Sequence, residues 1–108
     1  MDPPAVSDSF LAFLKQAPQF SGPWMQAVQQ LSQASSLDTR TRELAYLAVL
    51  AAVGLTSGVA FHAGLAKQAG ASRQDVISAV LLGLPAAGMR AIQSLPAALE
   101  AFDKPRQP

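Results

Sequence analysis

The sequence of 108 residues contains no cysteine, only one histidine and few charged side chains. Without cysteine the chain cannot form disulfides, thiolate metal sites or a thiol nucleophile. A single histidine is too few for a metal site built from several histidines. We therefore expect neither a metal nor another cofactor.

The scarcity of charged side chains argues against a further class, the nucleic-acid-binding proteins. Charged residues make up 14% of the chain, well below the ~25% of an average soluble protein. Eight basic and seven acidic side chains leave a net charge of +1, which argues against nucleic-acid binding, because that requires a basic patch. Apolar residues make up 50%, too many for a disordered chain. The length predicts one domain over residues 1–108, with frayed ends at 1–6 and 104–108.

β-Branched residues are also scarce, and this indicates an all-α fold. Valine, isoleucine and threonine together occur 12 times, against 21 alanines, 14 leucines and 10 glutamines. Alanine, leucine and glutamine lose little entropy in a helix, whereas β-branched side chains lose more. We found no stretch that alternates apolar and polar residues as a half-buried strand does. The expected architecture is a bundle of about six helices around a central antiparallel pair.

Local signals set the expected bounds of these helices. Pro18 limits the first, and the second opens at 21–23 with Pro23 near its first helical position. Asp38 is a good N-cap for the third, while Thr56 or Ser57 is the expected cap of the fourth. We expect helices at about 7–17, 21–33, 40–53, 56–69, 72–81 and 88–102.

Three further positions shape these expectations. Residues 72–75 resemble a capping box at the start of the fifth helix. Pro96 predicts a kink or break in the sixth helix. Trp24 lies at helical spacing from Val28, and an aromatic at such spacing is more often a core residue than a pocket residue.

A membrane span is the main alternative reading of the central segment. Residues 44–66 form 23 positions with no ionisable side chains except Tyr46 and His62, long enough to cross a bilayer. The stretch 54–58 contains two glycines in its middle, alanine dominates the hydropathy, and no aromatic belt flanks the segment. A buried helix pair is therefore favoured, and we expect a cytoplasmic protein without a membrane partner.

Glu43 and His62 are the residues in this segment that suggest chemistry. Two helices joined by a short turn pack antiparallel, and at about 1.5 Å per residue the two positions are offset by about 7 Å along the pair. Long side chains or one water can close that gap, so the two residues are candidates for an acid/base pair. The alternative is structural: a core histidine bonded to a carbonyl, and a glutamate that favours the helix start or pairs with Arg40 or Arg42.

The segments around this pair resemble the carboxymuconolactone decarboxylase and alkylhydroperoxidase D (AhpD-like) family. They are Leu37 to Leu44, the apolar helix, the Phe61-His62 pair and the Ala69 to Ser72 turn. Redox members of that family carry a glutamate, a CxxC pair and a histidine at fixed spacing. Glu43 and His62 match the first and last of these, whereas Leu55 and Gly58 occupy the two cysteine positions.

The family that the chain resembles has a peroxidase branch and a decarboxylase branch. Its peroxidase branch needs a thiolate, which this chain lacks, while its decarboxylase branch acts on a lactone carboxylate by proton transfer. The resemblance therefore implies Glu43 and His62 acting on a small organic acid or lactone, with Arg40, Arg42 and Arg90 as the cations that suit a carboxylate. The alternative is a catalytically silent oligomer with a structural or ligand-binding role.

The resemblance also implies assembly into a trimer or a hexamer, with sites near subunit contacts. The apolar fraction of 50% is consistent with this, because a chain of this size has difficulty hiding so much apolar surface as a monomer. The partners expected from the sequence are therefore further copies of the chain and a small organic acid, and no nucleic acid.

Overall fold

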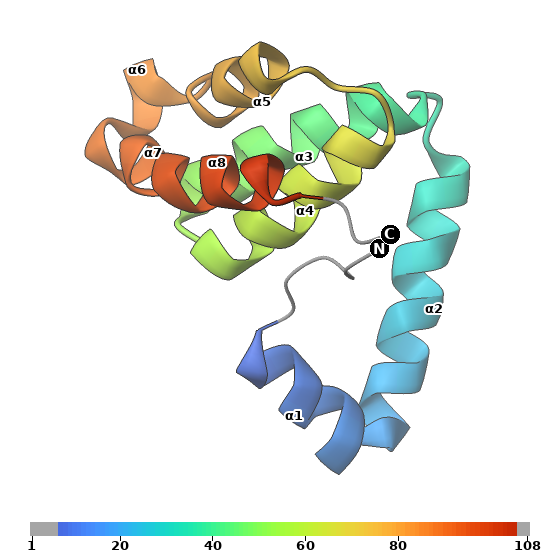
Figure 1. The fold of residues 1–108 in the computed structure, drawn as a ribbon. Helices are drawn as coiled ribbons and strands as arrows, with labels where there is room; N and C mark the ends of the chain where they lie inside the picture. Colours follow the sequence, from blue (N-terminus) through green and yellow to red (C-terminus); the bar gives the residue numbers. More distant parts are fainter. Residues whose placement is uncertain (1–6, 106–108) are drawn as a thin grey trace.

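Helices account for most of residues 7–105, the part of the chain that the computed structural model describes (Figure 1). This part of the chain contains helices and no strand, which confirms the all-α expectation. The expected fraying of residues 1–6 and 106–108 lies outside the described residues, and 104–105 follow the last helix without helical structure. The helices are α1 Asp8–Gln16, α2 Pro18–Ala34, α3 Thr39–Val53, α4 Thr56–Gln68, α5 Arg73–Val80, α6 Leu84–Ala87, α7 Met89–Gln93 and α8 Leu95–Asp103.

Several start and stop signals act as expected. Asp38 caps α3 by accepting a 2.8 Å hydrogen bond from the Thr41 backbone N–H, and this bond lowers the pKa of the Asp38 carboxyl. Ser72 and Asp75 complete the expected capping box of α5, each accepting a bond from the other's backbone N–H. The expected break before Pro96 is present, because Ser94 separates α7 from α8.

Other boundaries differ from the expectation, for local reasons. α2 begins at Pro18 rather than at 21–23, since the missing N–H of Pro18 falls at the first helical position, where no partner is needed. Pro23 lies inside this helix, which runs through it. α4 is capped neither by Thr56 nor by Ser57: its N-cap residue is Leu55, and no side chain bonds the helix start. The short helix α6, with Pro85 in its first turn, lies between two expected helices and was not expected itself.

The core is built from small side chains on the central antiparallel pair. α4 packs between α3 and α8, and α5 crosses α3 and α8 on one side (Figure 1). Alanines at these contacts let the helix axes approach closely. The buried apolar residues of these helices are Leu47, Leu50 and Ala51 of α3, Val59, Ala63 and Ala66 of α4, Val76, Ala79 and Val80 of α5, Ala91 of α7 and Ala98 of α8, and Ala71 before α5 is buried with them.

The N-terminal arm, formed by α1 and α2, stands apart from this core. Among residues 7–105, α2 makes its only extensive packing with α1, and α1 contributes no buried residue. Figure 1 shows α1 and most of α2 projecting away from the body made by α3 to α8. Trp24 is consequently 57% exposed, so the expectation that it is a core residue is wrong for the single chain.

The turn between α3 and α4 sets the geometry of the pair. Gly54 ends α3 in the left-handed region with φ +82°, which glycine adopts without strain. Arg90 lies against it and donates a 3.3 Å hydrogen bond from Nη1 to the carbonyl of Val53. A Cβ at Gly54 would lie 2.9 Å from that Nη1, so a side chain at position 54 would also require the Arg90 guanidinium to shift.

We predict that Gly54→Ala lowers the free energy of unfolding by about 1–2 kcal/mol, the cost of a left-handed non-glycine residue. Gly22→Ala is the matched control, because it has open space and a helical backbone, and it is expected to be neutral or to stabilise by up to about 1 kcal/mol. Urea unfolding measures both. Equal stabilities for the two variants would contradict the role given to Gly54.

Candidate active site: the Glu43–His62 pair

Glu43 and His62 meet across the central helix pair. Nδ1 of His62 lies 2.6 Å from Oε1 of Glu43, a direct contact with no water between them. Because an ionised carboxylate only accepts hydrogen bonds, Nδ1 is the donor, and Nε2 is left without a proton in the neutral ring. The expectation that these residues approach one another is confirmed. The ion-pair partner of Glu43 within the described residues is His62, not Arg40 or Arg42.

Helical spacing explains why the two side chains face each other. Glu43 precedes the buried Leu47 and Leu50 by four and seven residues, so it continues the face of α3 that packs on α4. His62 lies between the buried Val59 and Ala66 on the opposing helix. Both side chains therefore enter the contact between α3 and α4, at the end of α3 where the Asp38 cap fixes the helix start.

The pair is mostly buried but remains open to solvent. The His62 side chain is 22% exposed and the Glu43 side chain 13%. Two aromatic rings meet the imidazole edge-on, Tyr46 at 4.7 Å and Phe61 at 5.1 Å between ring centroids. These rings restrict the tilt of the imidazole, and the Glu43 carboxylate fixes which nitrogen carries the proton. The arrangement therefore presents one oriented imidazole whose Nε2 is not used in the bond to Glu43.

Leu55 and Gly58, the two positions predicted to correspond to the cysteines of redox relatives, lie on the same side of α4 as His62. Leu55 lies seven residues before His62, and Gly58 lies four residues before His62. The three positions therefore follow one face of the helix. Leu55 is exposed, and Gly58 carries no side chain beside Leu50, whose methyl carbons lie 3.4 Å from a Cβ built at this position. The described residues contain no cluster of three or more histidine, cysteine, aspartate or glutamate side chains that could hold a metal ion.

The three arginines take different places around the pair. Arg42 donates a weak 3.5 Å bond from Nη1 to the carbonyl of Leu37, at the start of α3. Arg90 lies at the other end of α3, against the turn that precedes Leu55. Arg40 is exposed near Asp75. They are therefore spread along the pair, and the sequence did not indicate that Arg90 also supports the α3–α4 turn.

Comparison with known proteins supports the family indicated by these residues. The profile described as "Carboxymuconolactone decarboxylase family" matches residues 18–102, from the start of α2 to α8. The chain belongs to the carboxymuconolactone decarboxylase family. Searches of curated proteins and of solved structures found no match. This member of the carboxymuconolactone decarboxylase family has no cysteine in its sequence, and no helix in the described part of its chain is both long and apolar enough to span a membrane.

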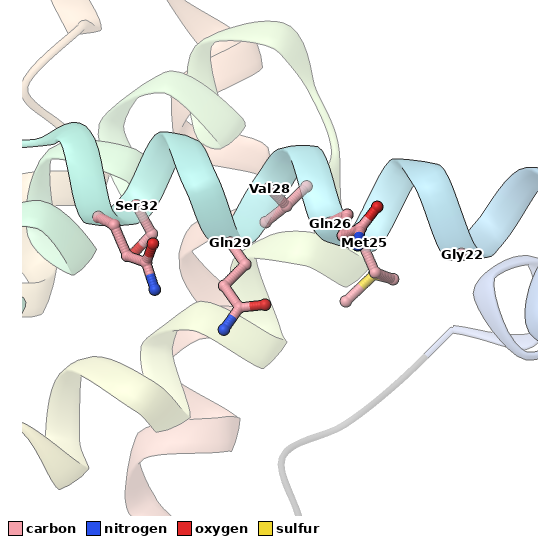
Figure 2. A pocket seen from close by; sticks show the side chains of 7 residues that line it. Gly22, Met25, Gln26, Val28, Gln29 and Ser32 are labelled. Carbon is pink, nitrogen blue, oxygen red and sulfur yellow. The ribbon is translucent and has the colours of Figure 1, made fainter.

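A hollow in this family member lies away from the pair. Figure 2 shows it along α2, where Met25, Gln29 and Ser32 project from one side of the helix. All of its lining residues come from this one helix, and neither Glu43 nor His62 is among them. A concavity lined by a single helix is a shallow groove, so it does not replace the Glu43–His62 pair as the candidate site.

We predict that neutral His62 carries its proton on Nδ1 and that Glu43→Ala shifts the tautomer toward Nε2–H, because the acceptor at Nδ1 is removed. The chain has one histidine, so ¹⁵N ring shifts recorded above pH 8 report this residue without ambiguity. Glu100→Ala, an exposed glutamate on α8, is the control. Identical ring shifts in the wild type and Glu43→Ala would contradict the hydrogen bond.

Proposed function

We propose that the protein is a cysteine-independent enzyme that uses Glu43 and His62 for acid/base chemistry on a small organic acid or lactone. The observation that carries this proposal is the 2.6 Å bond between Nδ1 of His62 and Oε1 of Glu43, which leaves Nε2 free. A carboxylate that orients an imidazole and stabilises its protonated form is a recurring arrangement in general acid/base catalysis.

The proposed reaction begins with a carboxylate whose loss leaves an electron pair on a carbon conjugated with a carbonyl. As carbon dioxide departs, that electron pair is delocalised as an enolate. Protonated His62 donates the proton from Nε2 to this carbon, and the imidazole regains a proton from solvent. Glu43 stabilises the imidazolium through Nδ1–H, because its charge lies next to the positive ring. Membership of the family supports this choice of reaction.

Binding of the substrate carboxylate requires a cation, and we assign this role to Arg90. Its guanidinium uses Nη1 to bond the Val53 carbonyl, and its other N–H groups remain suited to a carboxylate. Arg90 lies beside the turn that leads into Leu55.

A silent oligomer with a structural role is the alternative, and one observation favours it. Glu43 and His62 are hydrogen-bonded to each other, and their side chains are 87% and 78% buried, respectively. A purely structural pair would have the same features. In that case their replacement would reduce stability and nothing else. The two functions are therefore separated by whether the pair controls turnover or only folding.

We predict that His62→Gln and Glu43→Gln each lower kcat/KM by about 10²–10⁴-fold, the contribution of a positioned acid or base. The assay is release of carbon dioxide from a panel of small lactone acids, with urea unfolding of each variant alongside. Glu100→Gln is the control on the exposed face of α8. Absence of turnover across the panel, or turnover unchanged in His62→Gln, would contradict the proposed enzyme.

We predict that the wild type does not reduce an organic hydroperoxide with a dithiol donor, because no residue can form a sulfenic acid. The double variant Leu55→Cys/Gly58→Cys is expected to gain this activity, with alcohol, water and an enzyme disulfide as products. Position 55 begins α4, where the helix dipole favours a thiolate, and a Cβ at 58 meets only ordinary contacts.

The serine pair Leu55→Ser/Gly58→Ser is the control for this gain of activity, since it has similar size without the redox chemistry. Turnover by the wild type above the reagent blank would contradict the first expectation. A double cysteine variant that folds but stays as inactive as the serine control would contradict the match of positions 55 and 58 to the redox cysteines.

A further inference from the structure

Tyr46 carries a hydroxyl group to which neither the fold nor the proposed reaction gives a role. The residue follows Glu43 by three positions on α3, so it lies one turn further along the same side of the helix. Its ring meets the imidazole of His62 at 4.7 Å between centroids, with an angle of 80° between the ring planes. Tyr46 is therefore packed against the group that moves the proton in the proposed reaction.

Tyr46 is also the most accessible of the three residues at this site. It is 45% exposed, whereas the side chains of His62 and Glu43 are 22% and 13% exposed. The pair is thus partly open to solvent, and the tyrosine beside it is open to a larger extent. A small molecule that reaches His62 can therefore meet Tyr46 as well.

The hydroxyl of Tyr46 is available to a ligand. Within residues 7–105 it forms no hydrogen bond with another residue. A phenol hydroxyl can donate one hydrogen bond and accept others. Phenylalanine would make the same ring contact with His62, so packing on the imidazole does not require the hydroxyl. The contact explains the ring of Tyr46 and leaves its polar group without a function.

The proposed reaction, for its part, lacks a donor for the enolate oxygen. When carbon dioxide leaves, the electron pair of the breaking C–C bond is shared between the substrate carbon and its carbonyl oxygen. Nε2 of His62 delivers a proton to the carbon, while Nδ1 is held by Glu43, so neither nitrogen meets that oxygen. A donor placed where negative charge develops is often the largest contribution to catalysis of such a step.

The positions that surround the pair on its two helices offer few other donors. On α4, the positions one turn from His62 carry no polar side chain: they are Gly58, Val59, Leu65 and Ala66. On α3, the positions one turn from Glu43 are Thr39, Arg40, Tyr46 and Leu47. Among these, Tyr46 is the residue whose ring packs on the imidazole. Tyr46 therefore combines contact with His62 and a neutral hydrogen-bond donor in one side chain.

We propose that Tyr46 is a third catalytic residue, whose hydroxyl donates a hydrogen bond to the substrate carbonyl oxygen as that oxygen becomes an enolate. The assignment rests on the reaction proposed above and adds the group that recognises the substrate carbonyl. The bond between the carboxylate and its carbon breaks, and the electron pair moves onto the carbon and the oxygen. The Nε2 proton then forms the new C–H bond, and solvent returns a proton to the imidazole. Tyr46 keeps its own proton throughout.

Two unreactive acids isolate this hydrogen bond from all other contacts. Above pH 8, 4-hydroxy-3-nitrobenzoate carries a phenolate oxygen conjugated with its ring, in the manner of an enolate, whereas 3-nitrobenzoate lacks that oxygen. Tyr46→Phe removes the hydroxyl and keeps the ring beside His62. Tyr46→Phe is expected to bind the phenolate at least about 10-fold more weakly than the wild type does, the effect of one hydrogen bond to a charged group. Its affinity for 3-nitrobenzoate is expected to equal that of the wild type.

Val49→Ala is the matched control, because Val49 lies one turn after Tyr46 on α3 and is 55% exposed. This variant is expected to keep the wild-type ratio of the two affinities. Urea unfolding of both variants shows whether they fold as the wild type does. Equal binding of the phenolate by Tyr46→Phe and the wild type would overturn the assignment. An equal loss of affinity for both acids in a normally folded Tyr46→Phe, or a wild type that binds neither acid, would overturn it as well.

Turnover distinguishes this assignment from the proposed function itself. With a lactone acid that the wild type decarboxylates, Tyr46→Phe is expected to lower kcat about 10²-fold, the lower end of the range for one oxyanion donor, because water can partly replace an exposed hydroxyl. KM is expected to change little, since the carbonyl oxygen carries less charge before the reaction than in the enolate. An unchanged kcat would overturn the role of Tyr46 and leave that of Glu43 and His62 intact. A wild type without turnover would instead contradict the proposed enzyme, and Tyr46 would then retain only the ligand contact that the phenolate measures.

Discussion

The hydrogen bond between Glu43 and His62 is the interaction around which the central helix pair is organised. A carboxylate and an imidazole placed between two apolar helices must satisfy one another, because an unpaired charge there loses its solvation without compensation. A hydrogen bond to a charged group contributes about 1.5–3 kcal/mol net, and this one joins α3 to α4. The tight turn at Gly54 makes that contact possible, since it brings α4 back along α3 within two residues.

The same packing explains why the protein has so little core. Alanines allow α3, α4, α5 and α8 to approach closely, and the largest fully buried side chains in the described residues are Leu47, Val59, Val76, Val80 and Ser94. No aromatic side chain is among them. Large apolar side chains are instead exposed on α2 and on the outer face of α3, among them Phe20, Trp24 and Val49. The small core and the exposed arm thus result from the same distribution of large and small apolar side chains along the chain.

Much of the architecture follows from local sequence signals. The Asp38 cap, the capping box at Ser72, the glycine at the end of α3 and the break before Pro96 act over a few residues, so their effects can be predicted without knowing the fold. The Glu43–His62 contact was also predictable, because two apolar helices joined by a short turn leave few alternative registers. The bond length and the ring contacts of Tyr46 and Phe61 were not, since they depend on side-chain rotamers.

The predictions that the structure overturns lie in the arm and at the turn between α3 and α4. Pro23 was interpreted as a helix start and Trp24 as a core residue, because helical spacing shows which residues share a face but not what covers that face. Thr56 and Ser57 were interpreted as caps from residue type alone, whereas the backbone at Leu55 makes the turn without them. The supporting contact of Arg90 with the Gly54 turn joins residues 36 positions apart, beyond the reach of any local signal.

The most direct test of the account is whether a small lactone acid binds at the Glu43–His62 pair. The chain's single histidine can be labelled at Cε1 and followed by NMR while a small lactone acid is added to the protein. The account predicts a saturable change in the His62 signal, with a much weaker response in Glu43→Ala at the same concentrations. A His62 signal that stays unchanged while resonances elsewhere saturate would contradict it, because the ligand would then bind away from the pair.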